Sequence, residues 1–441
     1  MTPVSGPVLR QAPRVLCSVR EGRVLFYARD QRTVTVFTEA AWHIWEAFRA
    51  PTTAGQALEG FVHQDALLPC VNRMLERGIL SSSQDDAPRA EPQRSSPSGK
   101  LGDVYLHVTN RCNLRCLYCY NQAYRREADE QPELSTAELL NLLEQLPGLG
   151  TEGVIFTGGE PLLRTDCLEV AQAARRQGLA TTLLTNGTAL GKLAARTAAA
   201  FDDVIVSLDS CVAAEQEYIR PGGSFRQIAE GIRALVDAGG CRVRLRPVIT
   251  RHNVANLPEF PAFAASVLGC TDFMLALLTP GDLATDLLPD PLVYRRALRD
   301  FRQALAAVNG TSTMDRDELA ESAAGCGASA SLLSIAPNGD VFPCQCLHFP
   351  EMAAGNIRSL PLADIWRQAA SREVPEPFKA CSRCWAGGLC HLRCQALYHA
   401  FREVEDRFTR LVCPFALLEV EDSLWAQAAG HLDIPRAAKV S

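Results

Sequence analysis

The 441-residue sequence lacks any apolar run long enough to span a membrane, and its start, Met1 to Gly6, lacks the apolar segment of a secretory signal peptide. It also lacks an excess of positive charge, because 44 lysines and arginines stand against 50 acidic residues and the formal net charge is −6. No basic stripe of the kind that contacts nucleic acid is evident. These absences predict a cytoplasmic protein whose partners include neither a membrane nor a nucleic acid.

Cysteine, in contrast, is plentiful, with 17 in the chain. Disulfides are rare in the cytoplasm, so this number of cysteines indicates metal ligation rather than covalent crosslinks. The composition is otherwise that of a globular protein, with 47% hydrophobic and 21% charged residues. The length suggests about two to four domains, each able to bury a core of its own.

The chain divides at a polar stretch rich in proline and serine, residues 81–99, which has no periodicity and is typical of a flexible linker. Beyond it, short apolar strands alternate with amphipathic helices, which indicates βαβ units and an α/β fold, a partial (β/α)6 TIM-like barrel. Strands are predicted at 103–109, 153–157, 179–185, 203–208, 242–249 and 271–278. We predict a module at 1–82, a linker at 83–101, the barrel at 102–315, a cysteine-rich domain at 316–425 and a tail at 426–441.

Three cysteines, Cys112, Cys116 and Cys119, follow the apolar strand Val104–Val108 at CxxxCxxC spacing. Three thiolates can hold three irons of a [4Fe–4S] cluster, and the fourth iron is then free to chelate the amino and carboxylate groups of a small molecule. Short cysteine spacings are more often zinc knuckles. Three cysteines with no obvious fourth fit zinc poorly, because structural zinc sites are four-coordinate.

This spacing, with the aromatic Tyr118 before the last cysteine, resembles that of the radical S-adenosylmethionine superfamily. The resemblance implies reductive cleavage of S-adenosylmethionine to a 5′-deoxyadenosyl radical, which abstracts hydrogen from a substrate. It also implies cofactor contacts at the carboxyl ends of the following strands, where chemistry collects in parallel barrels. The matching residues are Gly158, Gly159 and Glu160 of a Gly-Gly-Glu-Pro element, Asn186, Ser207, Asp209 and Arg220. Taken alone, Asn186 could equally be a turn residue and Asp209 a helix N-cap.

The C-terminal region carries a second cysteine pattern, whose order of seven cysteines resembles the SPASM domain, an extension with auxiliary iron–sulfur clusters in many peptide-modifying radical enzymes. The resemblance implies one or two auxiliary clusters, expected as [4Fe–4S], a distal one and a proximal one whose nuclearity the sequence leaves open. The distal ligands would be Cys381, Cys384, Cys390 and Cys413, and the proximal ligands Cys326, Cys344 and Cys394. The alternative from spacing alone is a zinc knuckle closed by the pairs of cysteines between 381 and 394.

Cys346 has no place in that pattern. It could be the fourth proximal ligand, or a free thiol that leaves one iron open to substrate or water, and the sequence does not choose between these. His348, His391 and His399 are predicted to be surface or packing residues. Cysteines that match no ligand pattern are expected to be mostly buried and apolar in behaviour: Cys17, Cys70, Cys167, Cys211, Cys241 and Cys270.

The first 82 residues read as three strands followed by helices, an α+β pattern like a winged helix. Strands are predicted at 15–20, 23–28 and 33–37, and helices at 40–48, 53–61 and 64–77, the last with Leu67, Leu68, Val71, Met74 and Leu75 on its apolar face. The pattern resembles the RiPP recognition element, a module that binds the leader of a ribosomal precursor peptide by β-augmentation. A winged helix can also bind DNA, but the last helix here is poor in basic residues.

Together these features predict a radical S-adenosylmethionine peptide maturase that forms a thioether or carbon–carbon crosslink in a precursor peptide. A reductant such as flavodoxin or ferredoxin would supply the electron. The alternatives are maturation of a folded protein or cofactor precursor by the same chemistry, a zinc-stabilised winged-helix binding protein, and a plain electron-transfer iron–sulfur protein. The sequence does not identify the precursor, the bond formed, the reductant or the oligomeric state.

Overall fold

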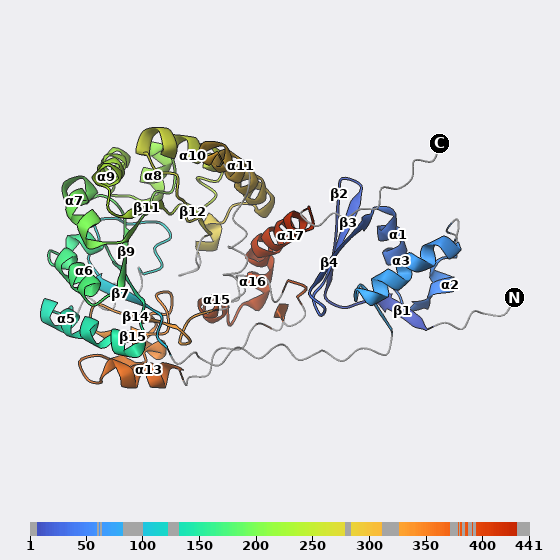
Figure 1. The fold of residues 1–441 in the computed structure, drawn as a ribbon, viewed down its shortest axis with the longest axis horizontal. Helices are drawn as coiled ribbons and strands as arrows, with labels where there is room; N and C mark the ends of the chain where they lie inside the picture. The colour runs from blue at the N-terminus through green and yellow to red at the C-terminus, as the bar shows by residue number, and fades with distance from the viewer. Residues whose placement is uncertain are drawn as a thin grey trace.

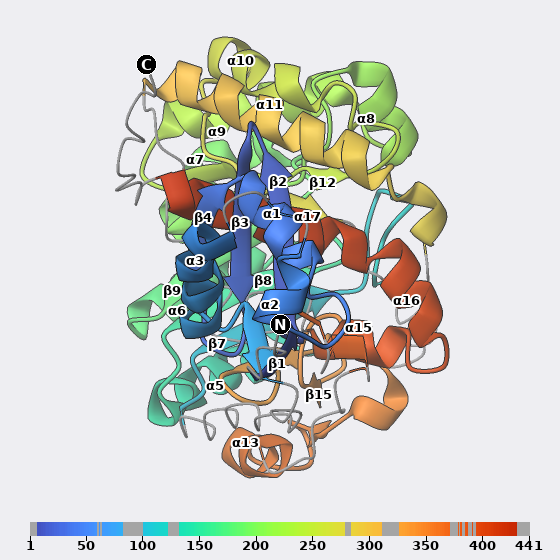
Figure 2. The ribbon, with the colours of Figure 1, turned by 90° about the vertical axis from the view of Figure 1, so that its right-hand side faces the viewer.

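The computed structural model describes residues 7–59, 61, 64–82, 100–121, 132–277, 284–310, 326–370, 378, 380–381, 384–386, 390 and 394–429. Figures 1 and 2 show a barrel-like sheet ringed by helices, with a small N-terminal module beside it and helix α17 (Cys413–Ala429) between the two. Within these residues, no helix is both long and apolar enough to cross a membrane.

One sheet forms the frame of the barrel, with its strands in the order β11-β10-β9-β8-β7-β14-β15-β16. The strands from β14 through β7 to β11 run parallel, whereas β15 and β16 are antiparallel additions. A separate parallel pair, β12 and β13, stands next to the β11 edge, where Leu245 bridges to Phe273. The bounds are β7 (Asp103–Thr109), β8 (Gly153–Gly158), β9 (Ala180–Thr185), β10 (Asp203–Val206), β11 (Arg242–Leu245), β12 (Val248–Ile249), β13 (Ala276–Leu277), β14 (Leu332–Ile335), β15 (Asp340–Phe342) and β16 (Gly355–Asn356).

The predicted α/β fold is confirmed, and four of its strands lie within a few residues of their predicted positions. The strand predicted at 242–249 is two short strands, since Arg246 and Pro247 interrupt it and proline cannot donate to a sheet. The region after residue 315, predicted as a separate cysteine-rich domain, also contributes strands to this sheet. Strand β14 pairs with β7, so the cysteine-rich region continues the barrel sheet.

Helices cover the outside of the sheet and bury one large apolar core against it. Helix α5 starts at a capping box, in which Ser135 and Glu138 exchange hydrogen bonds with each other's backbone. The helices are α5 (Thr136–Gln145), α6 (Cys167–Arg176), α7 (Leu190–Ala200), α8 (Ala213–Ile219), α9 (Phe225–Ala238), α10 (Phe260–Phe263) and α11 (Pro291–Asn309), followed by α13 (Leu362–Ala370), α15 (Gln395–Ala400) and α16 (Glu405–Leu411).

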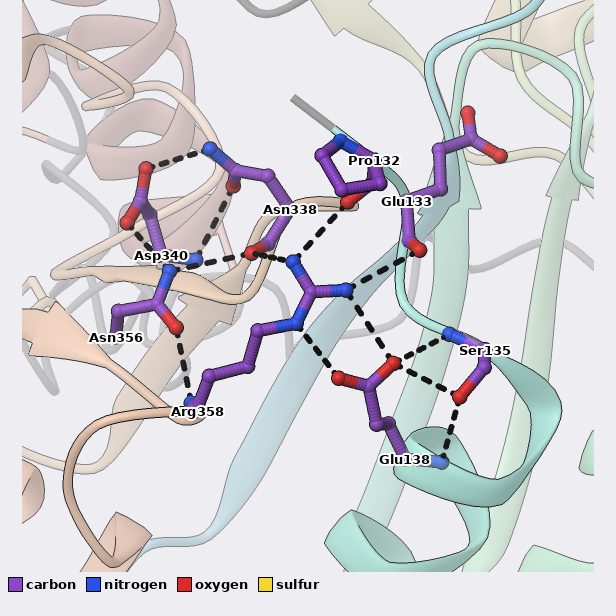
Figure 3. A network of polar contacts seen from close by, with 8 residues as sticks. All are labelled: Pro132, Glu133, Ser135, Glu138, Asn338, Asp340, Asn356 and Arg358. Carbon is purple, nitrogen blue, oxygen red and sulfur yellow. Dashed lines mark hydrogen bonds and ion pairs between the residues drawn. The ribbon is translucent and has the colours of Figure 1, made fainter.

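Arg358 ties the C-terminal strands to the start of helix α5 (Figure 3). Its guanidinium donates to the Glu138 carboxylate at 2.6 Å and to the carbonyls of Pro132, Glu133 and Asn338 at 3.1 to 3.3 Å. This arginine and the Ser135 cap lower the pKa of Glu138 to about 2. One side chain thus joins two segments about 220 residues apart.

We expect Arg358→Ala to lower the free energy of unfolding by about 1 kcal/mol at pH 7, because the Glu138 side chain is 36% exposed and water screens the pair. Since the pKa of Glu138 is depressed on folding, this contribution is present above the ordinary pKa of 4.5 and is lost as the pH falls toward 2. Urea unfolding of the metal-free variant and wild type at pH 7 and pH 3 measures it. Arg367→Ala, which removes an exposed ion pair with Asp364, is the control and should change nothing.

The N-terminal module contains the three strands and three helices expected from the sequence, in the sheet order β2-β3-β4. A second small sheet, β5-β1-β6, was not expected from the sequence, because its strands are two to four residues long. The elements are β1 (Val8–Gln11), β2 (Val15–Arg20), β3 (Arg23–Ala28), β4 (Thr33–Thr38), β5 (Thr52–Thr53), β6 (Leu80–Ser82), α1 (Ala40–Glu46), α2 (Ala54–Ala57) and α3 (Gln64–Glu76). Val71 and Met74 of α3 are buried as predicted, but Leu68 is 39% exposed, so its predicted place on the apolar face is wrong.

Both faces of the β2-β3-β4 sheet are covered. Val24 and Phe26 face the module's own helices, whereas Leu25 and Tyr27 pack against Val420 and other residues of α17. At the same interface, Arg29 donates to the carbonyls of Cys381 and Cys384 at 3.4 and 2.5 Å. The module therefore lies directly against the segment that carries the distal cysteines.

Candidate radical-cluster site

The CxxxCxxC loop begins where β7 ends, at the carboxyl edge of the parallel sheet. Glu133 holds this end of the strand, since its carboxylate accepts from the Thr109 hydroxyl at 2.7 Å and from the Asn110 N–H at 2.9 Å. Farther along the loop, the N–H groups of Arg115 and Leu117 donate to carbonyls just after helix α8 and at its end. The loop is therefore held from both sides.

Cys112 and Cys119 both lie within electrostatic reach of Cys116, and nitrogen donors point at the sulfurs of Cys112 and Cys116. Arg220 Nη1 lies 3.7 Å from Cys116 Sγ, Asn186 Nδ2 lies 4.0 Å from Cys112 Sγ, and the N–H of Leu114 lies 3.4 Å from Cys112 Sγ. Burial raises the pKa of the free Cys116 thiol to about 11, and the Arg220 cation opposes that rise. Donors aimed at sulfur suit thiolates that bind iron, so these residues fit a cluster.

The Gly-Gly-Glu element packs against this loop. A Cβ on Gly158 would lie 2.4 Å from the Thr109 carbonyl oxygen, and one on Gly159 would lie 2.1 Å from that of Arg111. Gly158 also has φ +125°, a conformation that other residues rarely adopt. The glycines were predicted to permit close approach to a ligand. In the structure, the close approach that requires them is between the end of β8 and the cluster loop.

Glu160 is buried and connects the ends of two neighbouring strands. Its carboxylate accepts from the Thr185 hydroxyl and the Asn186 N–H at 2.7 Å each, and from the Leu162 N–H at 3.2 Å. Burial raises the pKa of Glu160, and these three hydrogen bonds oppose the rise. Asn186 in turn donates to the Asn113 side chain at 2.9 Å and accepts from the Thr188 N–H. Asn186 is therefore both a turn residue and a support of the cluster loop.

Buried Asp209 and Arg220 form a polar group with Tyr118, a partly buried residue of the cluster loop. Arg220 Nε donates to Asp209 at 2.6 Å, and the Tyr118 hydroxyl contacts both Asp209 and Arg220. Asp209 also accepts from the N–H of Val248 at 2.9 Å. The reading of Asp209 as a helix N-cap is wrong, because helix α8 begins after Val212 and takes no side-chain cap. The arginine cation holds a buried carboxylate and a cluster cysteine together.

Two further residues lie near the site, Ser207, which the sequence pattern included, and Arg246, which it did not. Ser207 follows β10 and receives only a backbone role here, its N–H donating to the Thr185 carbonyl at 2.9 Å. Arg246 lies near Tyr105 and Tyr120, and its Nε has no hydrogen-bond partner among the described residues. Arg246 directly follows the end of β11, a position that would have marked it as a candidate site residue. It was missed because the one long strand predicted at 242–249 placed Arg246 in its interior.

The predicted proximal ligands meet in the structure. Cys326, Cys344 and Cys394 pack with Cys346 around Ala328, Leu347 and Ala396. The predicted distal ligands also gather, since Cys381, Cys384 and Cys390 all raise the pKa of Cys413, which burial brings to about 12. Across the described ranges, no three cysteine, histidine or acidic side chains meet closely enough to hold one metal ion. Thiolates of one cluster bind different irons and need not meet that closely.

The histidines near these cysteines are packing residues where the structure describes them. His348 lies between the rings of His107 and Phe342, each 4.4 Å away, and His399 is buried against Phe349. Burial lowers the pKa of His107 to about 3. His391 lies outside the described residues.

Of the six cysteines outside the ligand patterns, Cys167 and Cys270 are buried, and Cys17, Cys70, Cys211 and Cys241 are partly buried. Burial raises the pKa of each thiol. Two of the six are buried and the other four only partly, so the expectation that most are buried is wrong, although burial keeps all six thiols protonated.

Residues 106–260 match the family model described as the Radical SAM superfamily, and residues 326–385 match that of the SPASM iron–sulfur cluster-binding domain. Mycofactocin maturase MftC of Mycobacterium tuberculosis is 31% identical over 305 residues, 66% of this chain and 77% of that protein. PqqA peptide cyclase of Gluconobacter oxydans is 30% identical over 318 residues, 67% of this chain and 86% of that protein.

The fold has a counterpart among solved structures. The crystal structure of Streptococcus suis SuiB bound to S-adenosylmethionine aligns with a TM-score of 0.52 and 15% identity, over 87% of this chain and 94% of that one. The segment that matches the Radical SAM model contains the cluster loop, and the segment that matches the SPASM model contains Cys326 and Cys344. From the family models and the similarity to MftC over most of that protein, the chain belongs to the radical S-adenosylmethionine superfamily and is an enzyme that uses S-adenosylmethionine, a [4Fe–4S] cluster and SPASM auxiliary iron–sulfur clusters.

Proposed function

We propose that the chain is a peptide maturase that abstracts hydrogen from a ribosomally made precursor peptide. The observation that carries the proposal is the similarity, at 30 to 31% identity, to two proteins named as a maturase and a peptide cyclase. The N-terminal module supports it, because a protein that modifies peptides needs a surface on which to hold one.

In this proposal, Cys112, Cys116 and Cys119 hold the radical cluster, which with S-adenosylmethionine supplies a 5′-deoxyadenosyl radical. Arg220 and Asn186 direct nitrogen donors at the thiolate sulfurs, and Glu133 holds the end of β7 so that the loop keeps its shape. Tyr118, Gly158, Gly159, Glu160, Asn186, Ser207, Asp209 and Arg220 are proposed to contact or support the cofactor.

The leader of the precursor is proposed to bind along the outer edge of β4. Strand β4 is the last strand of its sheet, and among the described residues no other strand pairs with its outer edge. Helix α3 runs beside that edge, where Arg73 lies over the Phe37 ring at 5.7 Å and the Thr33 hydroxyl donates to the Arg77 carbonyl at 3.0 Å. Main-chain groups of an unpaired strand can bind an extended peptide as an additional strand.

The proposal also covers the product, the electron donor and the location of the enzyme. The product is a thioether or a carbon–carbon crosslink, a flavodoxin or ferredoxin supplies the electron, and the enzyme works in the cytoplasm. We assign leader binding to residues 1–82, radical formation to 102–315 and the auxiliary clusters to 316–425, with a linker at 83–101 and a tail at 426–441.

The test is anaerobic incubation of the reconstituted enzyme with S-adenosylmethionine, dithionite and the peptide encoded by a short open reading frame beside the gene. We expect 5′-deoxyadenosine and a precursor mass lowered by about two hydrogens, which is the balance of a crosslink that expels two hydrogen atoms. Formation of 5′-deoxyadenosine that no such peptide stimulates would favour a folded protein or a cofactor precursor as the substrate.

A further inference from the structure

The proximal cysteine group lacks one thiol if only the SPASM pattern is followed. The three cysteines of that pattern are Cys326, Cys344 and Cys394, whereas a four-iron cluster with every iron ligated by protein needs four. The next cysteine upstream of Cys326 in the sequence is Cys270. Cys270 is buried in the barrel wall, where its thiol donates to the Val243 carbonyl at 3.2 Å, so it cannot complete the set.

Cys346 lies in the proximal group itself. The four thiols form two neighbouring pairs, Cys344 with Cys346 and Cys394 with Cys326, and the Cys344 thiol also donates to the side-chain oxygen of Gln345 at 3.0 Å. The pairs are also near one another, since Cys344 lies within electrostatic reach of both Cys326 and Cys394. All four pack on one set of apolar residues.

A tight turn after β15 explains how two cysteines separated by one residue face the same way. The N–H of Leu347 donates to the Cys344 carbonyl at 3.0 Å, which closes the turn around Gln345 and Cys346. In a strand, residues two apart would also share a face, but a chain that ran straight on would carry the second thiol away from the other two cysteines. The turn keeps it beside them.

No other thiol of the chain can take this place. The distal cysteines gather around Cys413, the radical cysteines belong to the loop after β7, and the six cysteines outside the patterns are packing residues elsewhere in the fold. Cys346 also lies within electrostatic reach of Tyr105 and Tyr120, which belong to the barrel strand β7 and to the end of the cluster loop. Cys344 also lies within reach of Tyr105, so it is the Cys344–Cys346 pair, with Cys346 near Tyr120, that lies on the side of the proximal group toward the cluster loop.

We infer that Cys346 is the fourth ligand of the proximal auxiliary cluster, so that every iron of this cluster is bound by a thiolate. The thiol binds as thiolate and releases its proton to solvent. A cluster closed in this way cannot bind a substrate thiolate, and its role in the reaction is limited to electron transfer. This consequence rests on the proposed function, but the ligation itself can be tested without any substrate.

The test uses the full chain with Cys112, Cys116 and Cys119 replaced by alanine, so that only auxiliary clusters contribute to the spectra. With Cys346 present, we expect about eight irons per chain and a dithionite-reduced EPR spectrum that cyanide does not change. With Cys346→Ala added, cyanide should shift the proximal signal through the open iron, or the iron content should fall to about four. Cys241→Ala, which removes a partly buried thiol of the barrel, is the matched control and should leave both readouts unchanged.

Two results would overturn the inference. One is a cyanide-dependent change in the spectrum of the chain that retains Cys346, a measurement that does not depend on the folding of any Cys346 variant. The other is a Cys346→Ala chain with unaltered iron content, unaltered EPR spectrum and no response to cyanide. Since no peptide is present, either result leaves the proposed peptide substrate untouched.

Discussion

We expect cleavage of S-adenosylmethionine to be lost when Cys112, Cys116 and Cys119 are replaced together by alanine, whereas the auxiliary clusters should remain. The loop then offers no thiolate for iron, and no other cysteine lies in that loop. The SPASM cysteines are carried by separate segments that pack on their own apolar groups, so their clusters do not depend on the radical loop. We expect 5′-deoxyadenosine to fall to background and the iron content to fall from about twelve to about eight per chain.

Liquid chromatography of 5′-deoxyadenosine and an iron assay on the same sample measure both effects. A matched control is Cys211→Ala, which removes a partly buried thiol at the carboxyl side of the barrel that has no ligand role. The control should cleave the cofactor at the rate of the wild type. Continued cleavage by the triple variant would show that the radical site has been assigned to the wrong cysteines.

If the proposed function is right, we expect deletion of residues 1–82 to lower modification of the full-length precursor by about 100-fold or more, while cofactor cleavage without peptide continues. The physical reason is that a held leader raises the effective concentration of the core peptide at the barrel, and this advantage disappears with the module. Mass spectrometry of the precursor and the yield of 5′-deoxyadenosine separate the two effects.

The deletion also uncovers α17, because Leu25 and Tyr27 no longer cover Val420 and its neighbours, and it removes the contact of Arg29 with Cys381 and Cys384. The control for this is a cycle that pairs intact and truncated enzyme with full-length and leaderless precursor. If the module acts through the leader, removing both should cost no more than removing either one. A truncated enzyme that modifies full-length precursor at the normal rate would contradict leader binding by this module.

Several elements followed from local sequence alone. Apolar patterns placed β2, β3 and β4, helical spacing of apolar residues placed α3, and the strand–helix alternation placed β7 to β10, because such patterns record which faces are buried. The error at Leu68 has the same origin. A residue at helical spacing is assigned to the buried face, yet the structure leaves its side chain 39% exposed.

Long-range contacts could not be anticipated. The continuous apolar run Val24–Ala28 indicates a strand buried on both faces, but the helix that covers its second face begins at Cys413, almost 400 residues later. Of the two roles left open for Asp209, the helix N-cap is excluded by the start of α8 after Val212, whereas cofactor contact stays a prediction. The ion pair of Asp209 with Arg220 and its contact with Tyr118 are tertiary contacts that were not anticipated. The local sequence around Asp209 does not distinguish a helix N-cap from an ion-pair partner.

The closeness of Cys112, Cys116 and Cys119 therefore followed from the sequence alone, because a short loop holds residues at this spacing near one another. The grouping of the proximal cysteines, in contrast, is set by the tertiary structure alone, since Cys326, Cys344, Cys346 and Cys394 come from three separate segments. Their meeting depends on the pairing of β14 with β7, on the turn after β15 and on the start of α15. The position of the N-terminal module against Cys381 and Cys384 likewise comes from packing on α17, because apolar burial favours contact but does not specify the partner.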